Sequence, residues 1–144
     1  MVRALYYRPS PNLFKENKTM TINELLNKIV KQKPNSFTQA DLIAFVNEIE
    51  AEVAEQLGIT GEDVPVYDTT DLSTELLVGA PYDRLYVSYL KAQIDYATEE
   101  YDSYANNQAQ HVQDFQDFTD WVVREGKKQT TATGPRRFRH ITRW

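Results

Sequence analysis

The sequence of 144 residues contains no cysteine. This absence excludes disulfide bonds, a thiol nucleophile and cysteine metal ligands, and it suits a protein that assembles in a reducing cytoplasm. The sequence also lacks a run of about 18 apolar residues, so we expect neither a membrane-spanning helix nor a membrane partner. The apolar stretch at the start of the chain is too short for a signal peptide.

The residues that usually carry enzymatic chemistry are scarce. Only two histidines are present, His111 and His140, and they lie 29 positions apart. The spacings of zinc, phosphate-binding and nucleophile motifs are missing. Asp114, Asp117 and Asp120 share one helix face, which suits either a metal cluster or, far more commonly, a hydrated surface. We therefore expect no catalytic residues, no metal site and no cofactor, in a protein that is not an enzyme.

Basic residues are scarce in the middle of the chain and concentrated at its ends. Residues 20–123 hold five basic and nineteen acidic side chains, a net charge of −14. Residues 1–19 carry a net charge of +3 and residues 124–144 a net charge of +6. This asymmetry has two interpretations: simple solubility, or basic ends through which an acidic body contacts its partners.

Two helix starts are indicated by capping residues. Thr21 and Thr38 each precede an acidic residue by three positions, the spacing of a capping box. The apolar period then predicts helices over residues 22–32 and 39–57, and Gly58 is a natural stop for the second. The outer side of the second helix, which we expect to be solvated, carries four glutamates: Glu48, Glu50, Glu52 and Glu55.

Residues 58–79 have no helical period. Residues 64–67 have an extended pattern, residues 68–71 the composition of a turn, and residues 75–78 the pattern of a returning strand. We expect a loop or loose hairpin that projects from the helices. The side chains expected to make its contacts with a partner are Val64, Val66 and Tyr67.

The longest helical pattern covers residues 79–126, where apolar and aromatic residues recur at three- and four-residue steps. A single helix of this length would exceed the width of a small domain, so we expect it to fold back once. The predicted break is at Asn106 and Asn107, because asparagine competes with helix and favours an N-cap. The two helices would cover residues 82–104 and 108–125, with Gly126 as the final stop.

The sequence therefore predicts an all-α protein: a small four-helix bundle with a projecting loop or hairpin between its second and third helices and extended arms at both ends. Residues 20–126 form the helical domain, residues 1–19 an N-terminal arm and residues 127–144 a basic C-terminal arm. The N-terminal arm has two interpretations, a leader upstream of a start at Met20 or an arm that docks on a neighbouring subunit.

The third predicted helix carries more tyrosine than one subunit can bury, because its tyrosines cover more than one side. We expect a second packing surface, most simply against another copy of the chain; the alternative is a face divided between core and solvent. The candidate inter-subunit residues are Tyr82, Tyr86, Tyr89, Tyr96 and Tyr101.

The end of the chain, residues 136–144, alternates basic with aromatic or aliphatic side chains. Such a segment suits addition to the edge of a partner's sheet, or contact with phosphate or an acidic protein surface. The alternative is a plain basic tail. The residues that would make the contact are Arg136, Arg137, Phe138, Arg139, Ile141, Arg143 and Trp144.

Residues 20–125 resemble the head–tail connector (adaptor) proteins of long-tailed bacteriophages of Gram-positive hosts. The residues that carry the resemblance are MTINELL, KPNSF, FVNEIE, FQDFTDWVVRE and above all ELLVGAPYDRLYVSYLKAQIDYATEEYDSYANN, from Glu75 to Asn107. The resemblance covers about three quarters of the chain. The arm before Met20 departs from the usual pattern of the family.

The resemblance implies an all-helical subunit of the virion neck, assembled in the bacterial cytoplasm into a ring, commonly of twelve copies, beneath the portal protein. Such a ring extends the DNA channel, through which packaged DNA passes without sequence-specific binding, and provides a platform for a stopper or tail-completion protein. By position, the portal contact would fall on residues 136–144 and the inter-ring loop on residues 64–78. An acidic body suits a channel wall, because it repels DNA phosphate.

A nucleic-acid-binding module that uses the basic C-terminal tail is the alternative. Its binding to duplex DNA would fall steeply as the salt concentration rises. The net charge of −14 on residues 20–123 argues against it.

Overall fold

The computed structural model describes the chain from residue 19 to residue 133, with side chains up to residue 126. This part of the chain is helical, which confirms the predicted all-α, four-helix fold. No β-strand forms within it; one antiparallel bridge joins Thr21 to Glu75. Its elements are α2 (Ile22–Gln32), α3 (Gln39–Gln56), the short 3-10 helix η1 (Gly61–Asp63), α4 (Arg84–Ala97) and α5 (Tyr101–Thr133).

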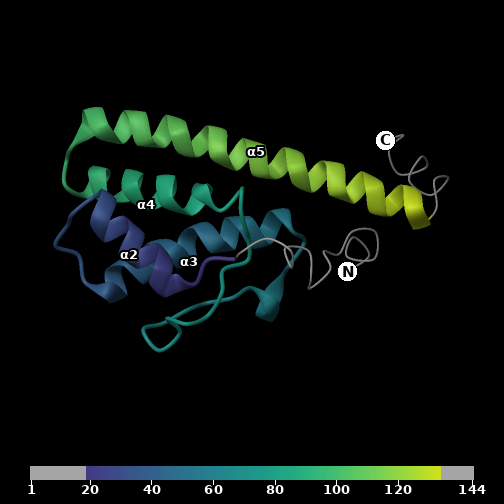
Figure 1. Ribbon diagram of the computed structural model, residues 1–144, viewed down its shortest axis with the longest axis horizontal. Coiled ribbons are helices and arrows are strands. Elements are labelled where there is room, and N and C mark those ends of the chain that lie inside the picture. Colours follow the sequence, from purple (N-terminus) through teal and green to yellow (C-terminus); the bar gives the residue numbers. More distant parts are fainter. Residues whose placement is uncertain (1–18, 134–144) are drawn as a thin grey trace.

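The helices pack in layers with α4 in the middle (Figure 1). Helix α5 runs back along α4 as an antiparallel hairpin, while α2 and α3 cover the opposite side of α4. Because α5 is much longer than α4, its C-terminal part extends beyond the point where α4 begins. The loop between η1 and α4 extends below α2 and α3 in the view of Figure 1.

Both predicted capping boxes are present, and they explain where α2 and α3 begin. The Glu24 amide donates to the Thr21 hydroxyl (3.2 Å), and the Thr21 amide donates to the Glu24 carboxylate (3.0 Å). Thr38 and Asp41 make the same pair of bonds, at 3.1 and 3.2 Å. These bonds satisfy amides that would otherwise lack a partner at the helix starts.

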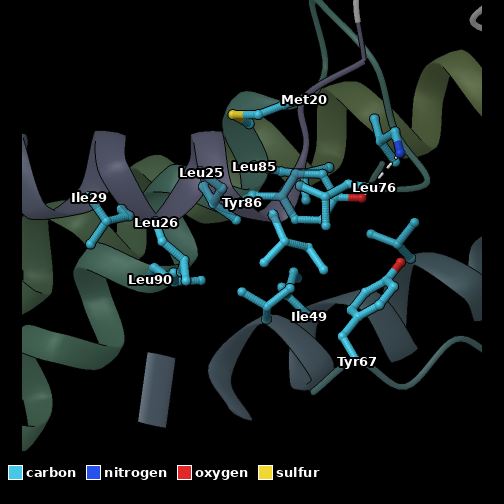
Figure 2. Close-up of a cluster of buried hydrophobic side chains, with 14 of the residues drawn as sticks. Met20, Leu25, Leu26, Ile29, Ile49, Tyr67, Leu76, Leu85, Tyr86 and Leu90 are labelled. Atoms are coloured by element: carbon cyan, nitrogen blue, oxygen red, sulfur yellow. Dashed lines mark hydrogen bonds between the residues drawn. The ribbon is translucent and has the colours of Figure 1, made fainter. Parts of the chain in front are cut away.

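One apolar core joins the helices to the loop that precedes α4 (Figure 2). Tyr86 lies at its centre, between α2 on one side and α3 on the other, and is fully buried. Each large apolar side chain removed from water in this way contributes roughly 1.5–3 kcal/mol. The residues labelled around it are Met20, Leu25, Leu26, Ile29, Ile49, Tyr67, Leu76, Leu85 and Leu90.

The break between the last two helices falls at residues 98–100, so the predicted break at Asn106 and Asn107 is wrong. The reason is the carboxylate of Asp95, which is buried near the end of α4. It accepts hydrogen bonds from the Ser103 hydroxyl (2.7 Å) and the Asn107 amide (2.6 Å), and both groups lie in the first turns of α5. Asn107 therefore stabilises the helical hairpin from inside α5 instead of ending a helix.

Gly126 does not end α5, and this prediction was also wrong. The helix continues to Thr133, so the first seven residues of the predicted C-terminal arm belong to it. A glycine inside a helix costs only about 1 kcal/mol relative to alanine, and the Glu, Lys, Lys and Gln that flank Gly126 favour helix. The predicted arms over residues 1–18 and 134–144 lie outside the described residues.

Candidate interaction surface

A buried carboxylate holds the loop before α4 against α3. Glu50 is fully buried, so the prediction that it lies on a solvated face is wrong. Its Oε1 accepts a hydrogen bond from the Tyr86 hydroxyl (2.5 Å), and its Oε2 accepts bonds from the Tyr67 hydroxyl (2.7 Å) and the Leu77 amide (2.9 Å). The Tyr86 hydroxyl in turn accepts a bond from the Val78 amide (3.1 Å). We call Glu50, Tyr67 and Tyr86 the carboxylate cluster.

The pKa values of the carboxylate cluster follow from its burial. Loss of solvation raises the pKa of Glu50, and the hydrogen bonds from the two tyrosines and Leu77 offset only part of this rise. Burial and the adjacent Glu50 carboxylate raise the pKa values of Tyr67 and Tyr86, so both hydroxyls remain protonated donors. The donors to Glu50 are thus two hydroxyls and one amide, and these neutral groups hold the loop against α3.

The carboxylate cluster removes two residues from the predicted contact surfaces. Tyr86 was predicted to contact another subunit and Tyr67 to contact a partner from the loop, but both side chains are buried within one chain. Two further bonds with Asn47, at 2.8 and 3.0 Å, hold the backbone of Tyr67. Val66 is 77% exposed and Val64 is half-buried, so these two loop residues remain accessible.

Tyr82 and Tyr89 are half-buried at the edge of the helices. The ring of Tyr82 lies 5.4 Å from that of Trp121 on α5. The hydroxyl of Tyr89 donates to the exposed carboxylate of Glu48 (2.8 Å). Burial, followed by that bond, raises the pKa of Tyr89. These tyrosines present one edge to solvent while the other packs, the divided arrangement that the sequence left open.

Among residues 19–126, the aromatic side chains that are more than half exposed lie where α4 turns into α5. Tyr96 and Tyr101 are 58% and 57% exposed, and the ring centroid of Tyr96 lies 6.0 Å from that of Tyr101 and 5.3 Å from that of Tyr104. We call these three residues the tyrosine corner. Two of the predicted inter-subunit residues, Tyr96 and Tyr101, thus lie together at an accessible place, and Tyr104 joins them.

Ion pairs and hydrogen bonds fix the turn between α4 and α5 that carries the tyrosine corner. Lys33, at the end of α2, forms ion pairs with the buried Asp95 and with Glu100 (3.0 Å). Burial favours a raised pKa for Asp95, but the bonds from Lys33, Ser103 and Asn107 outweigh it and hold the pKa below its usual value. The hydrogen bonds that Lys33 donates to Asp95 and then to Glu100 raise the pKa of Lys33. Lys33 and Asp95 therefore stay charged at neutral pH, and their ion pair fixes the turn between the two helices.

Two exposed valines lie further along α5, on the side of the helix that carries Tyr101. Val112 and Val123 are 58% and 56% exposed, close to the value for Tyr101. The three residues are eleven positions apart, which places them within about 40° of one another around the helix. Sequence reasoning missed these exposed valines because it assigned the apolar period of the last helix to the core; the eleven-residue spacing is the signal that it overlooked.

The described residues hold little that could perform chemistry. His111 is buried, and its Nδ1 lies 3.1 Å from the Leu85 carbonyl; burial lowers its pKa. Arg84 forms ion pairs with Asp114 (3.3 Å) and Asp117 (3.1 Å), and Asp114 is buried, so only part of this predicted hydrated face is solvated. Residues 19–126 contain no group of three or more acidic or histidine side chains suited to a metal ion.

The residues predicted to bind the portal, from Arg136 to Trp144, lie outside the part of the chain that the structure describes. Within the described helices, none is long and apolar enough to cross a membrane. Comparison of the chain with known protein families, with curated proteins and with solved structures gave no match.

Proposed function

We propose that this chain is a structural subunit of a virion neck: a head–tail connector that forms a ring beneath the portal and provides a platform for a stopper or tail-completion protein. The proposal starts from the resemblance of residues 20–125 to that family. Packaged DNA would pass through the ring without sequence-specific binding, and the subunit would be assembled in the cytoplasm of the bacterial host.

The observation that supports the proposal best is the exposed aromatic and aliphatic surface of the α4–α5 hairpin. Tyr101, Tyr104, Val112 and Val123 lie on α5 and Tyr96 lies at the end of α4; all of them are more than half exposed except Tyr104, which is half-buried. A subunit that functioned alone would leave this surface in water, whereas tyrosine-rich surfaces are typical of protein interfaces. A ring subunit has neighbours on two sides and therefore needs such surfaces.

The acidic charge of residues 20–123 agrees with a ring of subunits around DNA. The exposed side of α3 carries Glu48, Glu52 and Glu55, and residues 20–123 have a net charge of −14. An acidic wall repels phosphate, so DNA would not adhere to it. A connector also performs its role by binding neighbours, which requires no active site.

Electron microscopy and native mass spectrometry of the chain mixed with its portal protein test the proposal. We expect a ring stacked on the portal. Deletion of residues 134–144 should abolish co-sedimentation with the portal while leaving the helical circular dichroism signal unchanged. Portal particles that carry no bound chain, with the full-length protein folded and in excess, would refute the proposal.

A nucleic-acid-binding module remains the second candidate, because residues 124–144 carry a net charge of +6. Duplex DNA titrations at several salt concentrations separate the two functions. A module that neutralises several phosphates should lose affinity by orders of magnitude as salt rises, with a logarithmic slope of about −0.9 for each contact. A connector should show weak binding at every salt concentration.

A further inference from the structure

The tyrosine corner combines aromatic rings with acidic groups. Glu99 lies two residues before Tyr101 in the sequence and Asp102 one residue after it, and both side chains are exposed. Within residues 19–126, neither acid takes part in an ion pair, whereas nearby Glu100 pairs with Lys33. A surface of tyrosine faces with free carboxylates beside them suits arginine, which stacks on aromatic rings and bonds to carboxylates at the same time.

The chain itself contains a segment with the complementary composition. Residues 127–144 hold six basic side chains and no acidic one. Four of the six are arginines that alternate with aromatic or aliphatic residues over residues 136–144, including Phe138 and Trp144. This segment therefore offers both the charge and the apolar groups that the tyrosine corner lacks.

The length of α5 decides which copy of the segment can reach the tyrosine corner. Tyr101 and Thr133 are the two ends of this helix, so about 48 Å separate them at a rise of about 1.5 Å per residue. The eleven residues that follow Thr133 span at most about 40 Å even when fully extended. The segment therefore cannot return to the corner of its own chain, and a second copy has to supply it.

We propose that the tyrosine corner of one copy binds residues 136–144 of a second copy. The contact is heterologous, since one surface meets a different surface, and the bound pair keeps one unused corner on one copy and one unused segment on the other. Repetition of such a contact builds a closed ring or an open chain, which gives the proposed ring a specific subunit contact. A segment bound at a corner is not free for the portal, so the portal and the neighbouring copy compete for it.

A complementation experiment with the full-length chain tests this contact. The corner variant carries Tyr101→Ser and Asp102→Lys, and the tail variant carries Arg137→Gln and Arg139→Gln. Analytical ultracentrifugation should show that the wild-type chain self-associates, and that each variant alone requires about tenfold or more higher concentration to do so. An equimolar mixture of the two variants should form dimers and nothing larger, because only one complementary contact can form.

The matched control carries the same kinds of change on other elements. Val30→Ser on α2 with Glu62→Lys on η1 alters an apolar residue of comparable exposure and an exposed acid, 52% exposure at Val30 against 57% at Tyr101, away from the exposed surface of the α4–α5 hairpin. We expect this control to self-associate like the wild-type chain. Circular dichroism and thermal melting of all variants establish that they are folded.

Three results would overturn the inference. The first is a wild-type chain that remains monomeric at about 0.1 mM in low salt, a concentration that detects even weak contacts. The second is a tail variant that self-associates as the wild-type chain does. The third is a variant mixture that remains monomeric. None of these experiments contains portal protein, so their outcome is independent of whether the chain is a connector.

Discussion

The substitution Tyr86→Phe isolates the contribution of the carboxylate cluster to stability. It removes one hydroxyl and keeps the ring that fills the centre of the core, so no large cavity forms. The hydroxyl donates to Glu50 at 2.5 Å and accepts from the Val78 amide at 3.1 Å, and all three groups are buried. Both bonds disappear together in the variant.

The size of the effect follows from these two bonds. A hydrogen bond to a buried charged group contributes about 1.5–3 kcal/mol, and a buried amide left without an acceptor costs about 1–3 kcal/mol. We therefore expect Tyr86→Phe to lower the free energy of unfolding by about 3 kcal/mol or more. For a domain of this size, that corresponds to a fall in melting temperature of roughly 12 °C.

Tyr89→Phe is the matched control, because Tyr89 lies one turn further along α4 and also donates to a glutamate of α3. Its partner, Glu48, is exposed, and water can replace the 2.8 Å bond. The expected loss is about 0.5 kcal/mol. Urea denaturation measures both values, and hydrogen exchange should show faster exchange of the Leu77 and Val78 amides only in Tyr86→Phe. Equal losses in the two variants, both below about 1 kcal/mol, would refute our account of the cluster.

Three further predictions concern single residues. Burial raises the pKa of Glu50 above 4.5, so the folded state keeps the proton of Glu50 to higher pH than the unfolded state does. The free energy of unfolding should therefore fall as pH rises from 4.5 through that raised pKa. Urea denaturation of Glu50→Gln over the same pH range should not show this fall. Asp95→Ala leaves Lys33 without its buried partner and should lower the free energy of unfolding by about 3 kcal/mol. Asp102→Ala, at an exposed position, should lower it by under about 1 kcal/mol in the same assay. Equal losses in the two variants would contradict the role assigned to Asp95 in fixing the turn. Glu99 has φ +62°, so Glu99→Gly should raise the melting temperature slightly, by the equivalent of about 0.5 kcal/mol, and a fall would count against strain at this turn.

Local signals made the first half of the fold predictable. The hydroxyl of Thr21 or Thr38 and an acidic side chain three positions later act within one turn, so they need no information from the rest of the chain. Gly58 ends α3 as predicted, with φ +79°, for the same reason. Elements whose ends depend only on neighbouring residues can be read from sequence.

The errors arose where distant groups meet. Glu50 was assigned to solvent with three other glutamates, although it follows Val46 by four positions and precedes Val53 by three, which places it on the apolar face of α3. Its burial depends on donors from Tyr67, Tyr86 and the loop, and no local pattern contains them. The wrong break at Asn107 has the same origin, because the partner of its amide lies on another helix.

The candidate surface was predicted only in part. Tyrosine has an apolar ring and a polar hydroxyl, so composition alone cannot tell a buried tyrosine from one at an interface. Tyr96 and Tyr101 are exposed as an interface requires, whereas Tyr86 lies in the core. Only the packing of α4 between its neighbours separates these residues.

The continuity of α5 links the orientation of its two ends. Because the helix passes through Asn107 and Gly126 without interruption, each residue inserted or deleted between the tyrosine corner and Thr133 turns the end of the chain by about 100° and moves it by about 1.5 Å. Removal of seven residues is close to two full turns, so it shortens the helix while nearly preserving the direction in which the chain leaves it. In the proposed contact between copies, the number of residues in α5 therefore sets both the distance and the angle between successive subunits.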